Sequence, residues 1–255
     1  MPAQTDELLA YLFDGQPHPL AQPMAAWLAS SRRFAAFAAA FRDKIRKKLR
    51  TTQSQQGLLD LQLELQTAYL LLQERALSVA YEPEQSKGIR SPDFAVTFTT
   101  SFTFMLEVTR VQADVKDTAR ASRQPAPTPP GITSAAPPSH TRLTDAVLNK
   151  LGQLLARRGN VLLIAIEAPR LTPDDIRIVM LSLQQRVERN DSTVLQAYGF
   201  PDRAAFFRQF LRLSEILVRA PQEDAAEAML SWVNPQAKHP LPGRVRTVLH
   251  RSLAA

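Results

Sequence analysis

The stretch from Ser91 to Val111, SPDFAVTFTTSFTFMLEVTRV, constrains the fold of this chain more than any other. It is rich in Val, Thr and Phe, which favour strands, and Pro92 fits the first position of a strand because it has no amide hydrogen to donate. The pattern therefore predicts two strands that can pair as a hairpin. Each strand carries an acid in an apolar context, since Asp93 begins the first and Glu107 lies inside the second.

These two acids require a partner, because burying an isolated carboxylate is costly. A divalent cation shared by Asp93 and Glu107 would remove that cost. Magnesium takes carboxylate oxygens and keeps several waters, one of which can attack a phosphodiester. Because side chains alternate along a strand, Glu107 and Thr109 face one way and Arg110 faces the other. The structural alternative is a solvated Asp93 at the start of its strand and a buried Glu107 paired with an arginine.

The composition bounds the class of protein. The chain has 255 residues, 45% of them hydrophobic, which is enough for a sizeable core. It contains no cysteine, which excludes disulfides and thiolate metal sites. The longest apolar run, Val161–Ile166, is too short to span a bilayer, and the N-terminus lacks the pattern of a signal peptide. We therefore expect a cytoplasmic protein that is not associated with a membrane. The net charge of +7 favours an anionic partner, and nucleic acid is the commonest one.

Helical periodicity precedes the strand pair. Apolar residues recur at helical spacing over residues 5–13 and 23–50, and a third helix is predicted over 53–74, with Glu64 inside a leucine-rich stretch. The second helix has a heavily basic end, which fits either a patch that grips phosphates or a solvated helix end whose cations face the negative pole of the helix. Its six basic residues are Arg42, Lys44, Arg46, Lys47, Lys48 and Arg50.

The remaining elements follow from local signals. A short strand is predicted over 76–81. Residues 119–142 are dense in Pro, Ser, Thr and Ala, which predicts a disordered insertion. Thr144 is predicted to cap a helix that ends at Gly159, followed by a buried strand over 161–167. Toward the C-terminus we expect helices over 173–189 and 201–211, a strand over 213–219 and a final helix in the tail.

The order helix, three strands, helix, strand predicts an α/β fold with helices against the faces of a sheet. We divide the chain into three parts. Residues 1–52 form an N-terminal helical extension, residues 53–170 form the α/β core with its insertion, and residues 171–255 form a mostly helical part packed on the core.

In this order the motifs resemble those of the PD-(D/E)XK nuclease superfamily, whose core is the restriction-endonuclease-like fold. The resemblance covers about residues 53–167, and the tail is similar to that of an uncharacterised bacterial branch of the superfamily. The matching residues are Glu64 in the first helix, Pro92–Asp93, Glu107, then Lys150 and Gln153 in the next helix, and in the tail Asn234–Pro235 and Pro240–Leu241–Pro242.

The resemblance implies a nuclease that depends on Mg²⁺ or Mn²⁺ and acts on DNA. Asp93 and Glu107 would bind the metal directly, and Glu64 would be a third ligand or act through a water. The family's lysine comes two residues after the second acid, where this chain has Thr109. A threonine cannot supply the positive charge that a lysine contributes to the transition state.

Two residues of the following helix are candidates for the missing contacts. Lys150 is the candidate for a lysine that has moved to this helix, and its alternative is a solvated helix lysine. Gln153 is the candidate for a phosphate or base contact, and its alternative is a surface glutamine.

The departure at Thr109 keeps other functions open. One is a catalytically inactive module of the same fold that binds nucleic acid or a protein partner. Another is a helical interaction protein whose sheet is only a scaffold. No competing catalytic set is present in the sequence, since the four histidines are scattered and there is no glycine-rich phosphate loop.

Overall fold

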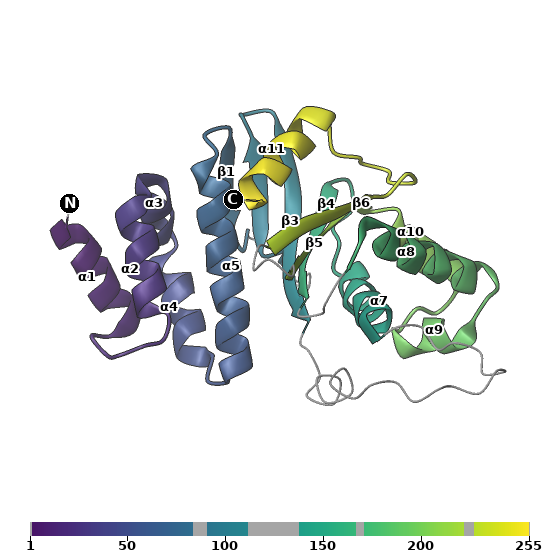
Figure 1. Cartoon of the computed structure of the whole chain (residues 1–255), viewed down its shortest axis with the longest axis horizontal. Coiled ribbons are helices and arrows are strands. Elements are labelled where there is room, and N and C mark those ends of the chain that lie inside the picture. Colours follow the sequence, from purple (N-terminus) through teal and green to yellow (C-terminus); the bar gives the residue numbers. More distant parts are fainter. Residues whose placement is uncertain (1, 84–90, 112–137, 167–170, 222–226, 255) are drawn as a thin grey trace. The chain divides into compact units, whose positions relative to one another are not determined.

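The computed structural model of the chain describes residues 2–83, 91–111, 138–166, 171–221 and 227–254 (Figure 1). The described chain is α/β, as predicted, and divides into two compact units. Unit 1 comprises Met1–Val108 and Leu241–Ala255, and unit 2 comprises Thr109–Pro240. The boundary lies within strand β3 (Phe102–Val111), inside the span of 53–170 that the sequence analysis assigns to one core.

The N-terminal helices of unit 1 are more broken than the sequence predicts. The single helix expected over 23–50 is wrong, because the chain forms α2 (Ala21–Ser30), α3 (Arg32–Ala40) and α4 (Arg42–Thr51) after α1 (Pro2–Phe13). Ser31 has extended backbone angles (φ −136°, ψ 108°), and its hydroxyl accepts a hydrogen bond from the amide of Phe34. A serine in this position satisfies an amide that the start of a helix leaves unpaired. The apolar periodicity continues through this cap and hides it.

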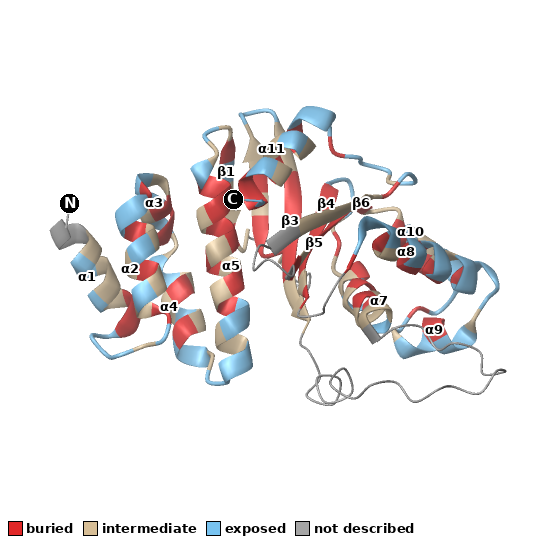
Figure 2. Ribbon diagram, in the orientation of Figure 1, coloured by how far each residue is buried: buried red, intermediate tan, exposed pale blue. Residues whose placement is uncertain are grey.

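Helix α5 (Gln55–Gln73) organises the core of unit 1. Buried residues run along it and along the strands beside it (Figure 2). The ring of Tyr69 contacts those of Trp27 and Phe34, with centroids 5.8 and 5.7 Å apart, which joins α5 to α2 and α3. Helix α11 (Gly243–Leu253) also packs on α5, and Arg251 forms an ion pair with Glu74 directly after it.

The strands of unit 1 form the predicted hairpin and its neighbour. β1 (Leu77–Tyr81) pairs antiparallel with β2 (Phe94–Phe98), and β2 pairs antiparallel with β3. The register places Tyr81 opposite Phe94 and Phe94 opposite Leu106, and all three residues are fully buried. The hydroxyls of Thr97 and Thr103 lie 2.8 Å apart across β2 and β3. Such cross-strand pairs stabilise the register.

Unit 2 contains its own strands and helices. β4 (Gly159–Ile166) pairs parallel with β5 (Leu213–Pro221), which pairs antiparallel with β6 (Glu227–Val233). The continuous apolar strand predicted over 161–167 is confirmed as far as Ile166. The helices are α7 (Pro138–Leu151), α8 (Pro173–Glu188), α9 (Ser192–Ala197) and α10 (Arg203–Phe210).

Several boundaries in unit 2 differ from the predictions. Helix α7 begins at Pro138, not after Thr144, whose hydroxyl donates to the carbonyl of His140 inside the helix (2.8 Å). The helix also ends at Leu151, while Gly159 begins β4. Most of the insertion predicted over 119–142 lies outside the described residues, and its last five residues are helical. The sequence analysis missed β6 and α9.

Candidate functional site

Most of the basic side chains of α4 contact other parts of unit 1. Arg46 and Arg50 both form ion pairs with Asp14, and these contacts lower the pKa of the Asp14 carboxyl. The Nζ atom of Lys44 donates to the carbonyl oxygens of Tyr81 (3.2 Å) and Glu82 (2.6 Å). The basic run therefore ties α4 to the end of α1 and to the end of β1, which is a third role beyond the phosphate-binding patch and the solvated helix end that the sequence suggests.

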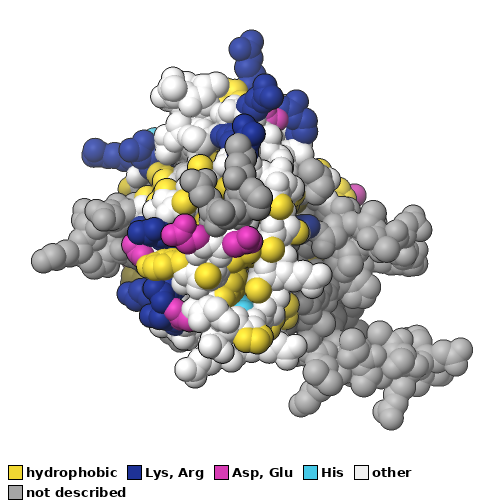
Figure 3. Space-filling model, turned by 90° about the vertical axis from the view of Figure 1, so that its left-hand side faces the viewer, with side chains coloured by type: hydrophobic (Ala, Val, Ile, Leu, Met, Phe, Trp, Pro, Cys, Tyr) yellow, Lys and Arg dark blue, Asp and Glu magenta, His cyan; other side chains and the backbone are white. Residues whose placement is uncertain are grey.

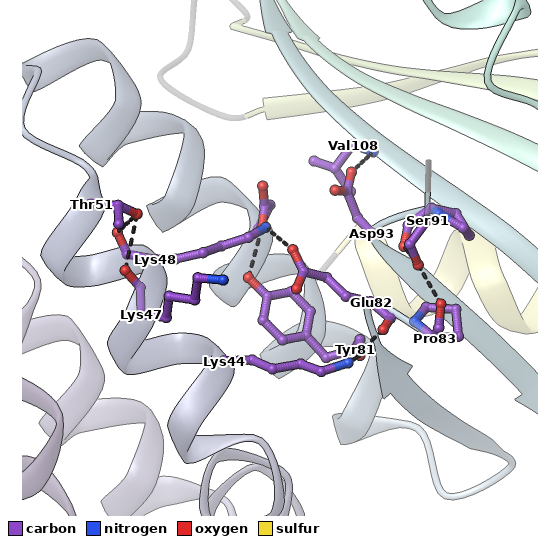
Figure 4. Close-up of polar contacts among 12 residues, drawn as sticks. Lys44, Lys47, Lys48, Thr51, Tyr81, Glu82, Pro83, Ser91, Asp93 and Val108 are labelled. Atoms are coloured by element: carbon purple, nitrogen blue, oxygen red, sulfur yellow. Dashed lines mark hydrogen bonds and ion pairs between the residues drawn. The ribbon is translucent and has the colours of Figure 1, made fainter. Parts of the chain in front are cut away.

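Lys48 lies between two carboxylates from different elements (Figure 4). Its Nζ is 2.7 Å from Oε2 of Glu64 on α5 and 2.9 Å from Oε1 of Glu82 directly after β1. The hydroxyl of Tyr81 donates to the same Glu64 oxygen at 2.8 Å. Burial alone would lower the pKa of Lys48, but the two carboxylates outweigh burial and raise it. Burial and the negative charge of Glu64 raise the pKa of Tyr81, which therefore stays protonated and donates.

Glu82 belongs to a row of three acids across the strands of unit 1. Its amide donates to the carbonyl oxygen of Asp93 (2.8 Å), so the ladder between β1 and β2 continues one step past the strand end. Glu82 has a positive φ of 42°, a conformation that turns the chain out of the strand. The row follows from the register, in which Tyr81, Phe94 and Leu106 lie opposite one another. Glu82 comes directly after Tyr81, Asp93 directly before Phe94, and Glu107 directly after Leu106.

Asp93 and Glu107 are brought together, as the sequence predicts. Oδ2 of Asp93 accepts a hydrogen bond from the amide of Val108 (2.8 Å), and Oε2 of Glu107 accepts a longer one from the amide of Asp93 (3.4 Å). Each carboxylate therefore binds the backbone beside the other. Both are buried, with exposed fractions of 9% and 4%. Two carboxylates this close repel each other unless a proton or a cation compensates their charge.

Glu64 does not join this pair. Tyr81 and Leu106 share a face of the strands, and the Tyr81 hydroxyl shows that this face is the one toward Glu64 and α5. Glu107 follows Leu106 in the chain, and alternation directs its side chain to the opposite face. Within the described residues, no three His, Cys, Asp or Glu side chains are grouped closely enough to hold a metal ion. The predicted cluster of Glu64, Asp93 and Glu107 is therefore wrong as a set of three ligands.

The remaining pair fits a hard divalent cation. Mg²⁺ is commonly bound by one or two carboxylates, with water and substrate phosphate filling the other positions. The oxygens of Asp93 and Glu107 match that preference, and the absence of cysteine excludes the thiolate sites of softer metals.

The other predicted site residues belong to unit 2. Thr109 lies two residues after Glu107 on β3 and is partly exposed. Lys150 lies in the last turn of α7, and Gln153 follows the helix, where its side chain donates to the carbonyl of Asn149 (3.4 Å). The roles assigned to Lys150 and Gln153 stay predictions.

The sequence analysis missed the polar network around Lys48. Tyr81 is the last residue of β1 and follows mostly apolar residues. Nothing in this sequence pattern distinguishes it from a tyrosine of the core. Lys48 is one of six basic residues between Arg42 and Arg50, so its pairing with Glu64 and Glu82 depends on packing that only the fold supplies.

Comparison of the chain with protein-family models, with curated proteins and with solved structures gave no match in any of the three. No helix among the described residues combines the length and apolar character needed to cross a membrane.

Proposed function

We propose that this protein is a metal-dependent phosphodiesterase that hydrolyses DNA, with a restriction-endonuclease-like core and an altered active site. The observation that carries the proposal is the pair of buried carboxylates, Asp93 and Glu107, on neighbouring strands at the end of an apolar sheet. Two carboxylates on neighbouring strands offer the oxygen ligands that a hard divalent cation prefers, which supports the proposal.

In this proposal Asp93 and Glu107 hold the metal, Mg²⁺ or Mn²⁺. When bound, the ion supplies positive charge to a phosphate oxygen and lowers the pKa of a bound water. The backbone amides of Asp93 and Val108 fix the orientation of the two carboxylates, which preorganises them before the ion arrives. Their burial keeps bulk water from screening the charge of the site.

Thr109 leaves the proposed site without the family's lysine, and Lys48 does not take its place. Lys48 pairs with Glu64 beside the Tyr81 hydroxyl, on the face of the strands opposite to Glu107. In this proposal Glu64 is therefore a partner of Lys48 rather than a metal ligand.

A plasmid-nicking assay in Mg²⁺ or Mn²⁺ tests the proposal. We expect wild-type protein to nick and linearise supercoiled DNA, and we expect Asp93→Asn and Glu107→Gln each to lose roughly two orders of magnitude or more in rate. Both substitutions keep the side-chain shape. Glu188→Gln, at an exposed position in α8, is the matched control and should nick at the wild-type rate. Equal activity of all four proteins would refute the proposal.

A second function is favoured by the engagement of Glu64 and by Thr109. In this function the protein is an inactive module that binds nucleic acid or a protein partner, and the Lys48–Glu64 pair only stabilises the fold. This function predicts DNA binding that weakens steeply with salt and does not require Asp93 or Glu107. An electrophoretic mobility assay of the Asp93→Asn variant without metal separates the two functions.

A further inference from the structure

Unit 1 contains a groove that the proposed catalytic function does not use. It has a volume of about 1150 Å³ and is partly open to solvent. One wall is α1, and the other consists of α2, α3 and the start of α4. Figure 3 views the molecule from the side of α1, where hydrophobic side chains emerge among acidic and basic ones.

The side of the groove formed by α2 and α3 is lined mainly by small apolar residues. Ala25 and Ala29 lie one turn apart on α2, and Ala35 and Ala39 lie one turn apart on α3. Leu28 also lines the groove and is buried, with an exposed fraction of 4%. Alanine side chains leave room for the larger side chains of a second molecule to approach the helix backbones closely.

The rim of the groove carries charges of both signs. Asp6 and Glu7 are exposed on the α1 wall, and Arg32 is exposed at the first position of α3 on the other wall. Arg42 begins α4 and lies over the ring of Tyr11, with its Cζ atom 5.1 Å from the centroid. A matching occupant would have an apolar stripe that faces the groove. It would carry positive charges on the flank toward α1 and negative charges on the flank toward α3.

An amphipathic α-helix has this chemistry. Its large apolar side chains recur every three or four residues on one face, and its flanks can carry opposite charges. A small molecule is a poorer match, since its pockets are usually more enclosed and have a few polar groups that converge on the ligand.

We propose that the groove between α1 and α2–α3 is the docking site for an amphipathic helix of a protein partner, with a basic flank that faces Asp6 and Glu7 and an acidic flank that faces Arg32. The partner's apolar side chains fill the space above Ala29 and Ala36. This function is independent of phosphodiester hydrolysis.

A display library of helical peptides with randomised apolar and charged positions can be selected for binding to the full-length protein. Fluorescence anisotropy then measures the affinity of the enriched peptides. We expect enriched peptides to be amphipathic, with opposite charges on the two flanks. Ala29→Trp fills the groove and should weaken binding at least about tenfold, equivalent to about 1.4 kcal/mol. Ala26→Trp is the matched control, because Ala26 is exposed on the same helix but does not line the groove, and it should bind as wild type does.

The charge arrangement gives an independent arm. Glu7→Lys should weaken the enriched peptide several-fold, and a peptide whose basic flank is changed to acidic should recover the loss. The proposal is overturned if no helical peptide is enriched, if Ala29→Trp binds as tightly as Ala26→Trp, or if the charge reversals do not compensate each other.

Discussion

Lys48 and Glu64 form an ion pair across α4 and α5, with Nζ and Oε2 2.7 Å apart, and this contact removes Glu64 from the acidic pair on the strands. The sequence suggests that Glu64 converges with Asp93 and Glu107. The structure instead gives Glu64 a lysine and a tyrosine as partners, on the face of the strands opposite to Glu107. The candidate site is therefore the pair of carboxylates of Asp93, directly before β2, and Glu107 on β3.

The first prediction concerns the strength of this ion pair. Lys48→Met leaves the carboxylates of Glu64 and Glu82 without their cation and should lower the free energy of unfolding by about 2 kcal/mol, between the values for exposed and buried pairs. The double variant Lys48→Met/Glu64→Gln should be less destabilised than the sum of the single variants, by about 1 kcal/mol. Urea unfolding of the four proteins measures the coupling. Additive effects would contradict a direct interaction.

The second prediction is a pH dependence in unit 2. Asp175 completes a capping box with Thr172, and the Thr172 hydroxyl is the main reason why the pKa of Asp175 lies below its usual value of 3.8, with a further contribution from His140. Because the folded pKa is depressed, the stabilisation is fully present above 3.8 and is lost as the pH falls through the folded pKa. Asp175→Ala should therefore cost about 1 kcal/mol near neutral pH, and this difference should shrink in acid.

Thermal unfolding of the wild type and Asp175→Ala across the acid range checks this prediction. Asp174→Ala is the control, since Asp174 is exposed in the same helical turn and does not bind Thr172. A difference between wild type and Asp175→Ala that stays constant down to low pH would show that the carboxylate charge is not responsible.

The third prediction concerns Tyr81 at high pH. Burial and the nearby Glu64 raise the pKa of Tyr81 above its usual value of 10.0, so the folded state holds a proton that the unfolded state loses. The stabilisation is fully present below 10.0 and declines as the pH rises above that value. Tyr81→Phe removes this titration, and its stability should fall less steeply in alkali than that of the wild type. Parallel alkaline curves in urea unfolding would contradict this account.

The fold could be predicted from the sequence where periodicity or composition carried the signal. The hairpin of β2 and β3, the long helix α5 and the apolar strand β4 each leave a distinct pattern. The helix predicted over 23–50 is broken at Ser31, whose hydroxyl caps α3. One serine is a weak sign of a helix start, and the helical spacing of apolar residues continues on both sides of it. The sequence of the strand β6, EAMLSWV, lacks the alternation of apolar and polar residues that marks a strand.

The site could be predicted only in part, for a related reason. Asp93 and Glu107 lie on adjacent strands, and strand pairing follows from local sequence. The partners of Glu64 depend instead on how α4 packs against α5 and on the turn at Glu82, which places its carboxylate next to Lys48. Side-chain contacts between two packed helices, even consecutive ones, leave no spacing rule in the sequence.

The fourth prediction concerns Asn160 at the start of β4. Its side chain is 1% exposed and bonds to four backbone groups, since Oδ1 accepts from the amide of Leu155 and Nδ2 donates to the carbonyls of Leu155, Arg158 and Arg212. Asn160→Leu leaves these groups without partners and should cost roughly 3 kcal/mol. Asn149→Leu, at an exposed position in α7, should change stability by less than about 0.5 kcal/mol. Urea midpoints with unchanged slope test both values.

The central claim is that Asp93 and Glu107 together bind a divalent cation, and calorimetric titration of the full-length protein with Mn²⁺ tests it most directly. We predict one site in the wild type with a micromolar to millimolar dissociation constant, lost in both Asp93→Asn and Glu107→Gln and retained in Glu188→Gln. Binding that is unchanged in both variants, or absent from the wild type, would contradict the account.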